Sequence, residues 1–156
     1  MSAKPLFTIG YEHATTDAFF DALGAAKVGL LVDVRAVAAS RRPGFSKRQL
    51  AAGLDQNGIG YVHLRKLGTP KEGRLAARAG HAAEMLRIFE RHLGTPDAAE
   101  ELDELTALAK ASLTSRRPIC LMCYERDPAH CHRQRLAAEL QSRLGMTVEN
   151  LFCAPV

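Results

Sequence analysis

The chain has 156 residues, enough for one domain that buries roughly two-thirds of its unfolded surface, and its 47% apolar and 24% charged residues are typical of a globular protein. A net charge of +4 and a pI near 9.0 are compatible with an anionic partner but are too small to demonstrate one. No apolar stretch is long enough for a signal peptide or for the roughly 20 residues that span a bilayer, so we expect a cytoplasmic protein without a membrane partner, its four cysteines reduced.

The first part of the chain predicts two strands around one helix. Residues 6–9 are a short apolar run that ends at Gly10, and they predict the first strand. Apolar residues at helical spacing predict a helix over residues 15–27. Residues 29–35 are apolar almost to their end, which is typical of a strand buried on both faces of a sheet.

The middle of the chain predicts a helix, a strand and a long loop. Ser46 and Gln49 have the spacing of a capping box, with Ser46 as N-cap, so we predict a helix over residues 46–56. Residues 61–64 predict the next strand. Residues 67–80 are rich in glycine, proline and charge, and they predict an irregular loop.

The remaining residues predict further helices and strands in alternation. Helices are expected over residues 81–93, 96–113 and 127–144, and strands over residues 118–123 and 147–151. This alternation predicts a single α/β domain over residues 1–156, with a largely parallel sheet and helices on both faces in a Rossmann-like three-layer arrangement. No internal repeat or linker suggests a division of the chain.

Polar residues follow several of the predicted strands. In open α/β sheets, ligands bind beyond the carboxyl ends of the strands, where loops lead into helices. The residues that the sequence places at this edge are Tyr11, His13, Asp33, Arg35, His63, Cys123 and Glu125. We therefore expect one polar cleft there.

Asp33 and Arg35 end a buried strand and lie two residues apart, so they share a face of the sheet. The Asp33 carboxylate is a candidate general base, and the Arg35 guanidinium can hold an anion in a bidentate fork. The alternative is that the two side chains pair with each other or with neighbours and close the sheet.

A basic segment, residues 40–48, leads into the helix that Ser46 begins. Free N–H groups and the dipole at a helix N-terminus favour phosphate, so Ser40 and Arg41 are candidate ligand-binding residues, as is Tyr11. The alternative is an ordinary solvated basic loop.

Residues 123–133 carry the densest chemistry of the chain. If a helix starts at Asp127, Cys131 is about its fourth residue, where a thiol can have a lowered pKa and act as a nucleophile. His132 and Glu125 are candidate acid/base groups, and Arg133 is a candidate anion ligand. In the alternative interpretation, Cys131 packs as a small apolar residue and Arg133 pairs with Glu125.

A metal site and a nucleotide cofactor site are less favoured. Cys120 and Cys123 have a C-x-x-C spacing, but residues i and i+3 of a strand point to opposite faces, so both thiols cannot easily reach one ion. No metal is therefore predicted. The chain also has neither a P-loop nor a G-x-G-x-x-G pattern, so neither NTP hydrolysis nor a dinucleotide cofactor is indicated, and no cofactor is predicted.

An ordered set of short motifs runs through the chain. The set comprises Thr8-Ile9-Gly10, Asp33-Val34-Arg35, Ser40-Arg41 with Phe45, Tyr61-Val62-His63-Leu64, Cys123-x-Glu125 and Cys131-His132-Arg133. Together they resemble the DUF488 family, a domain of unknown function, over about residues 6–151. The resemblance implies a compact α/β domain with its marked polar residues at one site. It supplies no established reaction, although an association of some relatives with DNA repair suggests a nucleic-acid setting.

The leading hypothesis is a cleft that binds a phosphorylated or nucleotide-like ligand with hydrolase or transferase activity. Arg35, Arg41 and Arg133 would hold the anion, while Asp33 and Glu125 do acid/base work. One alternative is a non-catalytic nucleic-acid-binding module that uses the basic segment. A second alternative is a metal or thiol-redox protein.

Overall fold

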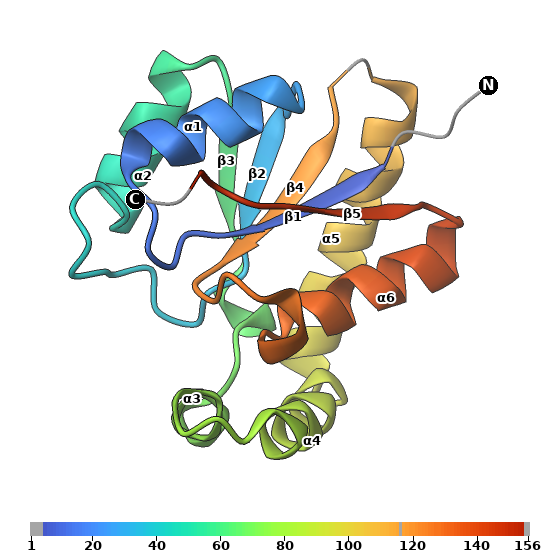
Figure 1. Cartoon of the computed structure of the whole chain (residues 1–156). Helices are drawn as coiled ribbons and strands as arrows, with labels where there is room; N and C mark the ends of the chain where they lie inside the picture. The colour runs from blue at the N-terminus through green and yellow to red at the C-terminus, as the bar shows by residue number, and fades with distance from the viewer. Residues whose placement is uncertain (1–4, 116, 155–156) are drawn as a thin grey trace.

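A five-stranded parallel sheet forms the centre of the computed structural model, which describes residues 5–115 and 117–154 (Figure 1). The strand order is β3-β2-β4-β1-β5. The strands are β1 (Leu6–Gly10), β2 (Leu30–Asp33), β3 (Gly60–His63), β4 (Ile119–Cys123) and β5 (Val148–Leu151). The helices are α1 (Thr16–Ala25), α2 (Lys47–Gln56), α3 (Lys71–Arg78), α4 (Ala82–Leu93), α5 (Pro96–Thr114) and α6 (Arg133–Leu144), with short 3-10 helices η1 (Arg65–Leu67) and η2 (Pro128–His130).

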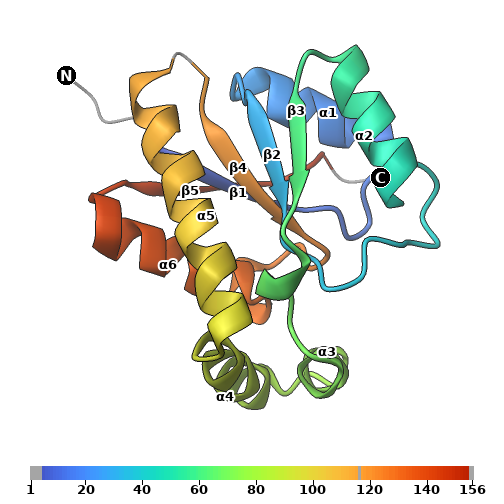
Figure 2. The same cartoon turned by 180° about the vertical axis from the view of Figure 1, so that it is seen from behind.

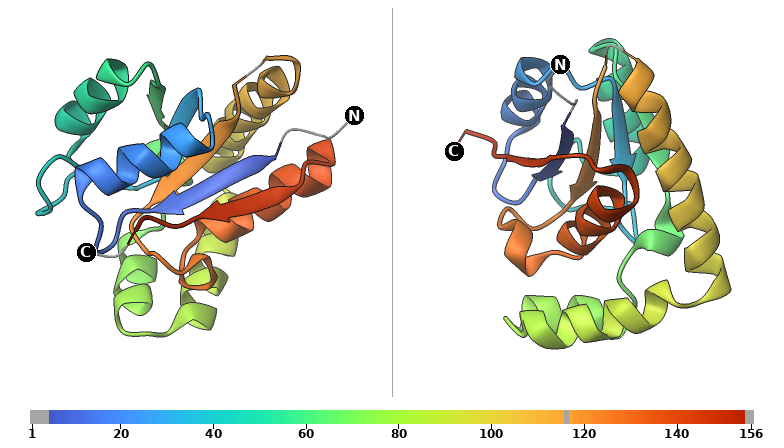
Figure 3. Two further views of the ribbon diagram at one scale, coloured as in Figure 1. Left: turned by 45° about the horizontal axis from the view of Figure 1, so that its top comes forward. Right: turned by 90° about the vertical axis from the view of Figure 1, so that its right-hand side faces the viewer.

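Helices cover both faces of the sheet, which confirms the predicted Rossmann-like α/β fold. Helices α1 and α2 lie on one face, whereas α5 and α6 lie on the other, as the view from behind shows (Figures 1 and 2). The α3–α4 pair lies apart from these layers, beyond the carboxyl ends of the strands (Figure 3). In the described part of the chain, no helix is both long and apolar enough to cross a membrane.

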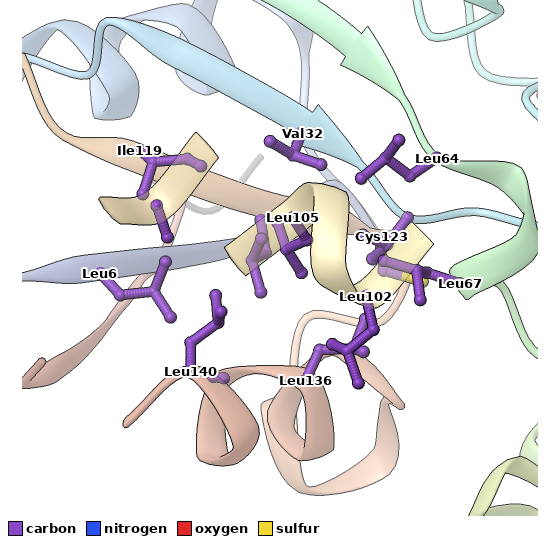
Figure 4. Packing of buried hydrophobic residues seen from close by; sticks show 14 of the residues in the cluster. Leu6, Val32, Leu64, Leu67, Leu102, Leu105, Ile119, Cys123, Leu136 and Leu140 are labelled. Atoms are coloured by element: carbon purple, nitrogen blue, oxygen red, sulfur yellow. The ribbon is translucent and has the colours of Figure 1, made fainter. Parts of the chain in front are cut away.

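Two hydrophobic cores follow from the alternation of side chains along the strands. On β4, Ile119, Leu121 and Cys123 pack into the core beneath α5 and α6 (Figure 4). Cys120 and Met122 point the other way, into the core beneath α1 and α2. The predicted separation of Cys120 and Cys123 onto opposite faces is therefore confirmed.

The chain leaves the neighbouring strands β2 and β4 toward opposite faces of the sheet. After β2 it runs to α2, and after β4 it runs to α6, on the other side (Figure 3). Such a divergence of connections is where open α/β sheets bind ligands. The fold thus supplies the expected edge, between the carboxyl ends of β2 and β4.

The prediction of an irregular loop over residues 67–80 was wrong in its second half. Residues Lys71–Arg78 form helix α3, which packs against α4. Gly73 lowers helix propensity, but it permits close packing, because a Cβ there would lie 2.1 Å from Thr69 Cγ2. Tertiary packing therefore stabilises a helix that the local sequence disfavours.

The prediction of a continuous helix from Asp127 was also wrong. Asp127 caps only the 3-10 turn Pro128–His130, by accepting a hydrogen bond from the Ala129 N–H at 2.9 Å. Cys131 is then extended (φ −129°, ψ 142°), and α6 starts at Arg133 with His132 as N-cap. Cys131 consequently precedes the helix instead of occupying its fourth position.

The helix predicted at Ser46 is present, but the predicted capping box is not. Ser46 is the N-cap of α2, yet its hydroxyl donates to the Ser40 carbonyl (3.2 Å) and accepts from the Ser40 N–H (3.0 Å). Gln49 accepts from the Gly44 N–H at 3.1 Å instead of from Ser46. Both side chains thereby fix the loop over residues 40–46, which borders the cleft described next.

Candidate functional site: a basic cleft with a thiol–imidazole floor

A cleft of about 750 Å³ lies at the carboxyl edge of the sheet, between the loops after β1, β2 and β4 and helix α3. It brings together most of the residues predicted from the sequence. Those that line it are Tyr11, Arg35, Ser40, Arg41, Glu125, Cys131 and His132. Asp33 and Arg133 are not among its lining residues, and both are fully buried.

Asp33 is occupied by a buried ion pair with Arg35. Its carboxylate accepts from Arg35 Nε (2.9 Å), Nη2 (2.7 Å) and the Arg35 backbone N–H (3.1 Å). It also accepts from the Tyr61 hydroxyl at 2.6 Å. Burial and the bond to Asp33 raise the pKa of Tyr61. These contacts correspond to the alternative interpretation of Asp33 and Arg35, in which they pair with each other.

The rest of the Arg35 guanidinium fixes the wall of the cleft. Nη1 donates to the Phe45 carbonyl (2.8 Å) and to the Tyr11 hydroxyl (3.3 Å). The Tyr11 ring stacks on Phe45 with centroids 4.6 Å apart, and Tyr124 meets its edge at 5.3 Å. Burial alone lowers the pKa of Arg35, but the bonds and the charge of Asp33 outweigh it and raise the pKa. Arg35 is 5% exposed, so only a small part of this cation faces the cleft.

Besides Arg35, five cations line the cleft, and we call them the basic rim: Arg41, Arg42, Lys71, Arg74 and Arg78. None of them forms an ion pair within residues 5–115 and 117–154. Arg42 and Arg74 donate instead to backbone carbonyls. The rim is therefore a concentration of positive charge without a direct carboxylate partner among the described residues.

At the floor, three side chains meet that we call the thiol–imidazole cluster: Cys123, Cys131 and His132. The His132 Nδ1 atom lies 3.7 Å from Cys123 Sγ and 3.8 Å from Cys131 Sγ. The other ring nitrogen, Nε2, donates to the Val34 carbonyl at 2.8 Å, since a carbonyl can only accept. The ring is also packed edge-on against Phe89, with centroids 4.9 Å apart. All three side chains are buried and border the cleft.

The pKa values of Cys123, Cys131 and Glu125 at the floor are shifted from their ordinary values. Burial raises the pKa of Cys131, but the hydrogen bond from Cys123 and the charges of His132 and Arg133 outweigh it, so its pKa lies well below the usual value. The same hydrogen bond, together with burial, raises the pKa of Cys123. Burial and the Cys131 charge raise the pKa of Glu125 to about 7. The floor thus favours a Cys131 thiolate beside an acid that can hold its proton near neutrality.

Arg133 supports the loop that carries Glu125. Its Nη1 donates to the Glu125 carbonyl at 2.5 Å and its Nη2 to the Arg126 carbonyl at 3.3 Å. Its Nε has no hydrogen-bond partner among the described residues. The loop passes so close to β1 that a Cβ on Gly10 would lie 1.8 Å from the Glu125 carbonyl oxygen. Arg133 accordingly binds backbone carbonyls. The alternative interpretation of the sequence, in which Arg133 pairs with the Glu125 carboxylate, is wrong.

The two histidines expected at the strand ends do not join the cleft. His63 Nε2 contacts the Arg35 carbonyl at 2.8 Å, and His13 is exposed in a turn with φ 62°. Cys123 lines the cleft as expected from its place at the end of a strand, whereas the cations of α3 line it without having been predicted to do so. The C-x-x-C spacing suggested Cys120 as the partner of Cys123, whereas in the structure Cys123 lies next to Cys131 and His132.

Residues 15–140 match the protein-family model described as "Domain of unknown function DUF488". The matched segment includes the basic rim and the thiol–imidazole cluster. No curated protein and no solved structure matches the chain significantly.

Proposed function

The chain belongs to the DUF488 family, and we propose that its cleft binds a phosphorylated or nucleotide-like ligand and acts on it as a hydrolase or transferase. One observation carries this proposal: the basic rim and the polar floor, with Glu125, Cys131 and His132, line the same cleft. A ligand whose anionic group contacts the rim would present the rest of the molecule to the floor.

The basic rim supports recognition of a phosphate. Its five side chains form no ion pair in the part of the chain that the structure describes, and guanidinium groups bind phosphate through paired, charge-assisted hydrogen bonds. The Ser40 hydroxyl at the same wall can add a further contact. The N-terminus of α2 does not line the cleft, so the phosphate contact that we propose is made by side chains.

Tyr124 supports a ligand that also has a planar group. This residue lines the cleft, is 40% exposed, and is held against the Tyr11 ring. A partly exposed aromatic side chain next to cations is the combination that binds a base and its phosphate.

The floor supports chemistry on the bound ligand. The half-buried Glu125 carboxyl lies 3.7 Å from Cys123 Sγ and borders the cleft, so it can transfer a proton to or from a ligand there. Cys131 and His132 assist at the same place. We assign Asp33 a positioning role, because all of its contacts hold Arg35 and Tyr61. Arg133 likewise positions Glu125 through the backbone.

The proposal is tested by thermal-shift measurements with phosphate, nucleotides, nucleosides and short DNA and RNA. A ligand at about 100 times its Kd stabilises the folded state by about 2.7 kcal/mol, which raises the Tm of a domain of this size by about 5–10 °C. Arg41→Ala removes a rim cation and should weaken binding about tenfold to a hundredfold. Arg48→Ala is the matched control, because Arg48 is exposed but does not line the cleft. A small ligand that binds both variants equally would contradict the proposal.

A second candidate, a non-catalytic nucleic-acid-binding module, is favoured by the basic surface that continues outside the cleft. Lys47 and Arg48 are exposed and form no ion pair within the described residues. This function predicts that Arg48→Ala weakens oligonucleotide binding as much as Arg41→Ala. It also predicts that affinity falls steeply with salt: the logarithm of the binding constant should fall with the logarithm of the salt concentration by about 0.9 for each phosphate contact. Binding confined to small ligands would eliminate it.

A further inference from the structure

The thiol–imidazole cluster has the dimensions of a metal-binding site. The two sulfur atoms and the His132 Nδ1 all lie within 4.8 Å of one another, and both S···N distances are below 3.9 Å. Around a tetrahedral zinc ion, bonds of about 2.3 Å to sulfur and about 2.0 Å to nitrogen place sulfur and nitrogen about 3.5 Å apart and two sulfurs about 3.8 Å apart. The two S···N distances would therefore change by only a few tenths of an ångström around an ion, and the S···S distance, which is at most 4.8 Å, by at most about 1 Å.

The second nitrogen of His132 is bound as it is in metal sites. A metal-ligating histidine almost always donates its other ring N–H to a carbonyl or carboxylate, which fixes the tautomer and the orientation of the ring. Here Nε2 donates to the Val34 carbonyl at 2.8 Å and Phe89 packs against the ring. The Nδ1 atom is thus presented to the two sulfurs.

The charges around the cluster are also suited to a cation with two thiolate ligands. A divalent ion and two thiolates cancel in charge, so the site needs no counter-ion from the buried Arg133 guanidinium, which binds the Glu125 and Arg126 carbonyls. Thiolate ligands select zinc and similar soft ions over magnesium or calcium.

We propose that Cys123, Cys131 and His132 bind a zinc ion whose fourth position faces the cleft. All three ligands border the cleft, so a water molecule or a ligand oxygen can reach the ion, and Glu125 lies beside that position. Two cysteines, one histidine and an open position are typical of catalytic zinc. In that role, which rests on the function proposed above, the ion would polarise a phosphoryl oxygen or activate water. The binding of the ion itself does not depend on that function.

Metal content of the full chain, purified without chelators and after incubation with zinc, tests the site. One zinc ion per chain is expected, with loss of the ion in Cys123→Ala, Cys131→Ala and His132→Ala. Cys120→Ala and Cys153→Ala are matched controls, because both remove buried cysteines outside the cluster, and they should keep the ion. Cobalt in place of zinc should give thiolate-to-cobalt charge-transfer absorption that disappears in the first three variants only.

X-ray absorption of the zinc-loaded wild-type protein gives a result that does not depend on the folding of variants. The expected shell has two sulfurs at about 2.3 Å and one nitrogen at about 2.0 Å. A shell without sulfur, a protein that takes up no zinc, or a Cys123–Cys131 disulfide in freshly prepared protein would overturn the proposal. The ligand panel is measured separately, so zinc binding without any anion ligand would contradict the proposed function alone.

Discussion

The buried pair of Asp33 and Arg35 gives a quantitative prediction. Asp33→Asn keeps the side-chain volume but removes the charge opposite Arg35, which is 5% exposed and has no other carboxylate contact among the described residues. Removal of one partner from a buried ion pair costs about 3–5 kcal/mol, because the remaining charge stays desolvated. Since domains are stable by only about 5–15 kcal/mol, this loss is a large fraction of the total free energy of unfolding.

Urea denaturation followed by circular dichroism measures this loss. Asp103→Asn is the matched control, because it breaks an exposed ion pair with Arg143 and should cost at most about 1 kcal/mol. The double substitution Asp33→Leu with Arg35→Met removes both charges and should be less destabilising than Asp33→Asn alone. If Asp33→Asn costs no more than Asp103→Asn, the positioning role assigned to Asp33 is wrong.

Two further predictions concern stability. Gly10→Ala should lower the urea midpoint, because the added Cβ would overlap the Glu125 carbonyl oxygen. Gly24→Ala is the control, because its Cβ would meet nothing within 4 Å, and it should be neutral or stabilising by up to about 1 kcal/mol. Equal effects of the two substitutions would refute the close approach of the Glu125 loop to Gly10. Hydrogen bonds from Arg143 and Arg135 lower the pKa of Glu139 from its ordinary value of 4.5. The ionised Glu139 therefore stabilises the folded state fully above pH 4.5, and this stabilisation is lost as the pH falls through the lowered pKa. Glu139→Gln should therefore destabilise at neutral pH and have less effect in acid, and an acid-dependent loss that is unchanged in the variant would contradict this.

The sheet could be predicted closely because each strand is a local signal. Residues 118–123 were predicted for β4 (Ile119–Cys123), and residues 147–151 for β5 (Val148–Leu151). The apolar run of β4 reflects burial on both faces, which the sequence shows directly, whereas β5 is an edge strand with no buried residue. The strand order, with β4 between β1 and β2, depends on contacts between distant segments and could not be predicted in this way.

Helix α3 shows where local reasoning fails. Its eight residues contain Gly73 and follow Pro70, so propensity and turn signals both favoured a loop. The helix forms because it packs on α4, and that contact is tertiary. The cations that α3 contributes to the basic rim were missed for the same reason.

The floor of the cleft was predicted in part. The motif that contains Cys131 and His132 was identified from its chemistry, and the alternation of side chains correctly separated Cys120 from Cys123. The meeting of Cys123 with Cys131 depends on the turn over residues 128–130, which returns the chain to the end of β4. Likewise, the sequence placed Asp33 at the right edge, but only the positions of Arg35 and Tyr61 show that its carboxylate is occupied.

The central claim is that the basic rim binds the phosphate of a ligand on which the residues of the floor then act. The most direct measurement is product formation from the ligand that gives the largest thermal shift, compared in wild type, Glu125→Gln and Arg41→Ala. Glu125→Gln should keep the affinity and lose turnover, because the proposed function assigns proton transfer to Glu125, whereas Arg41→Ala should lose affinity, because it assigns phosphate binding to Arg41. Wild-type turnover by Glu125→Gln, together with unchanged binding by Arg41→Ala, would contradict the account.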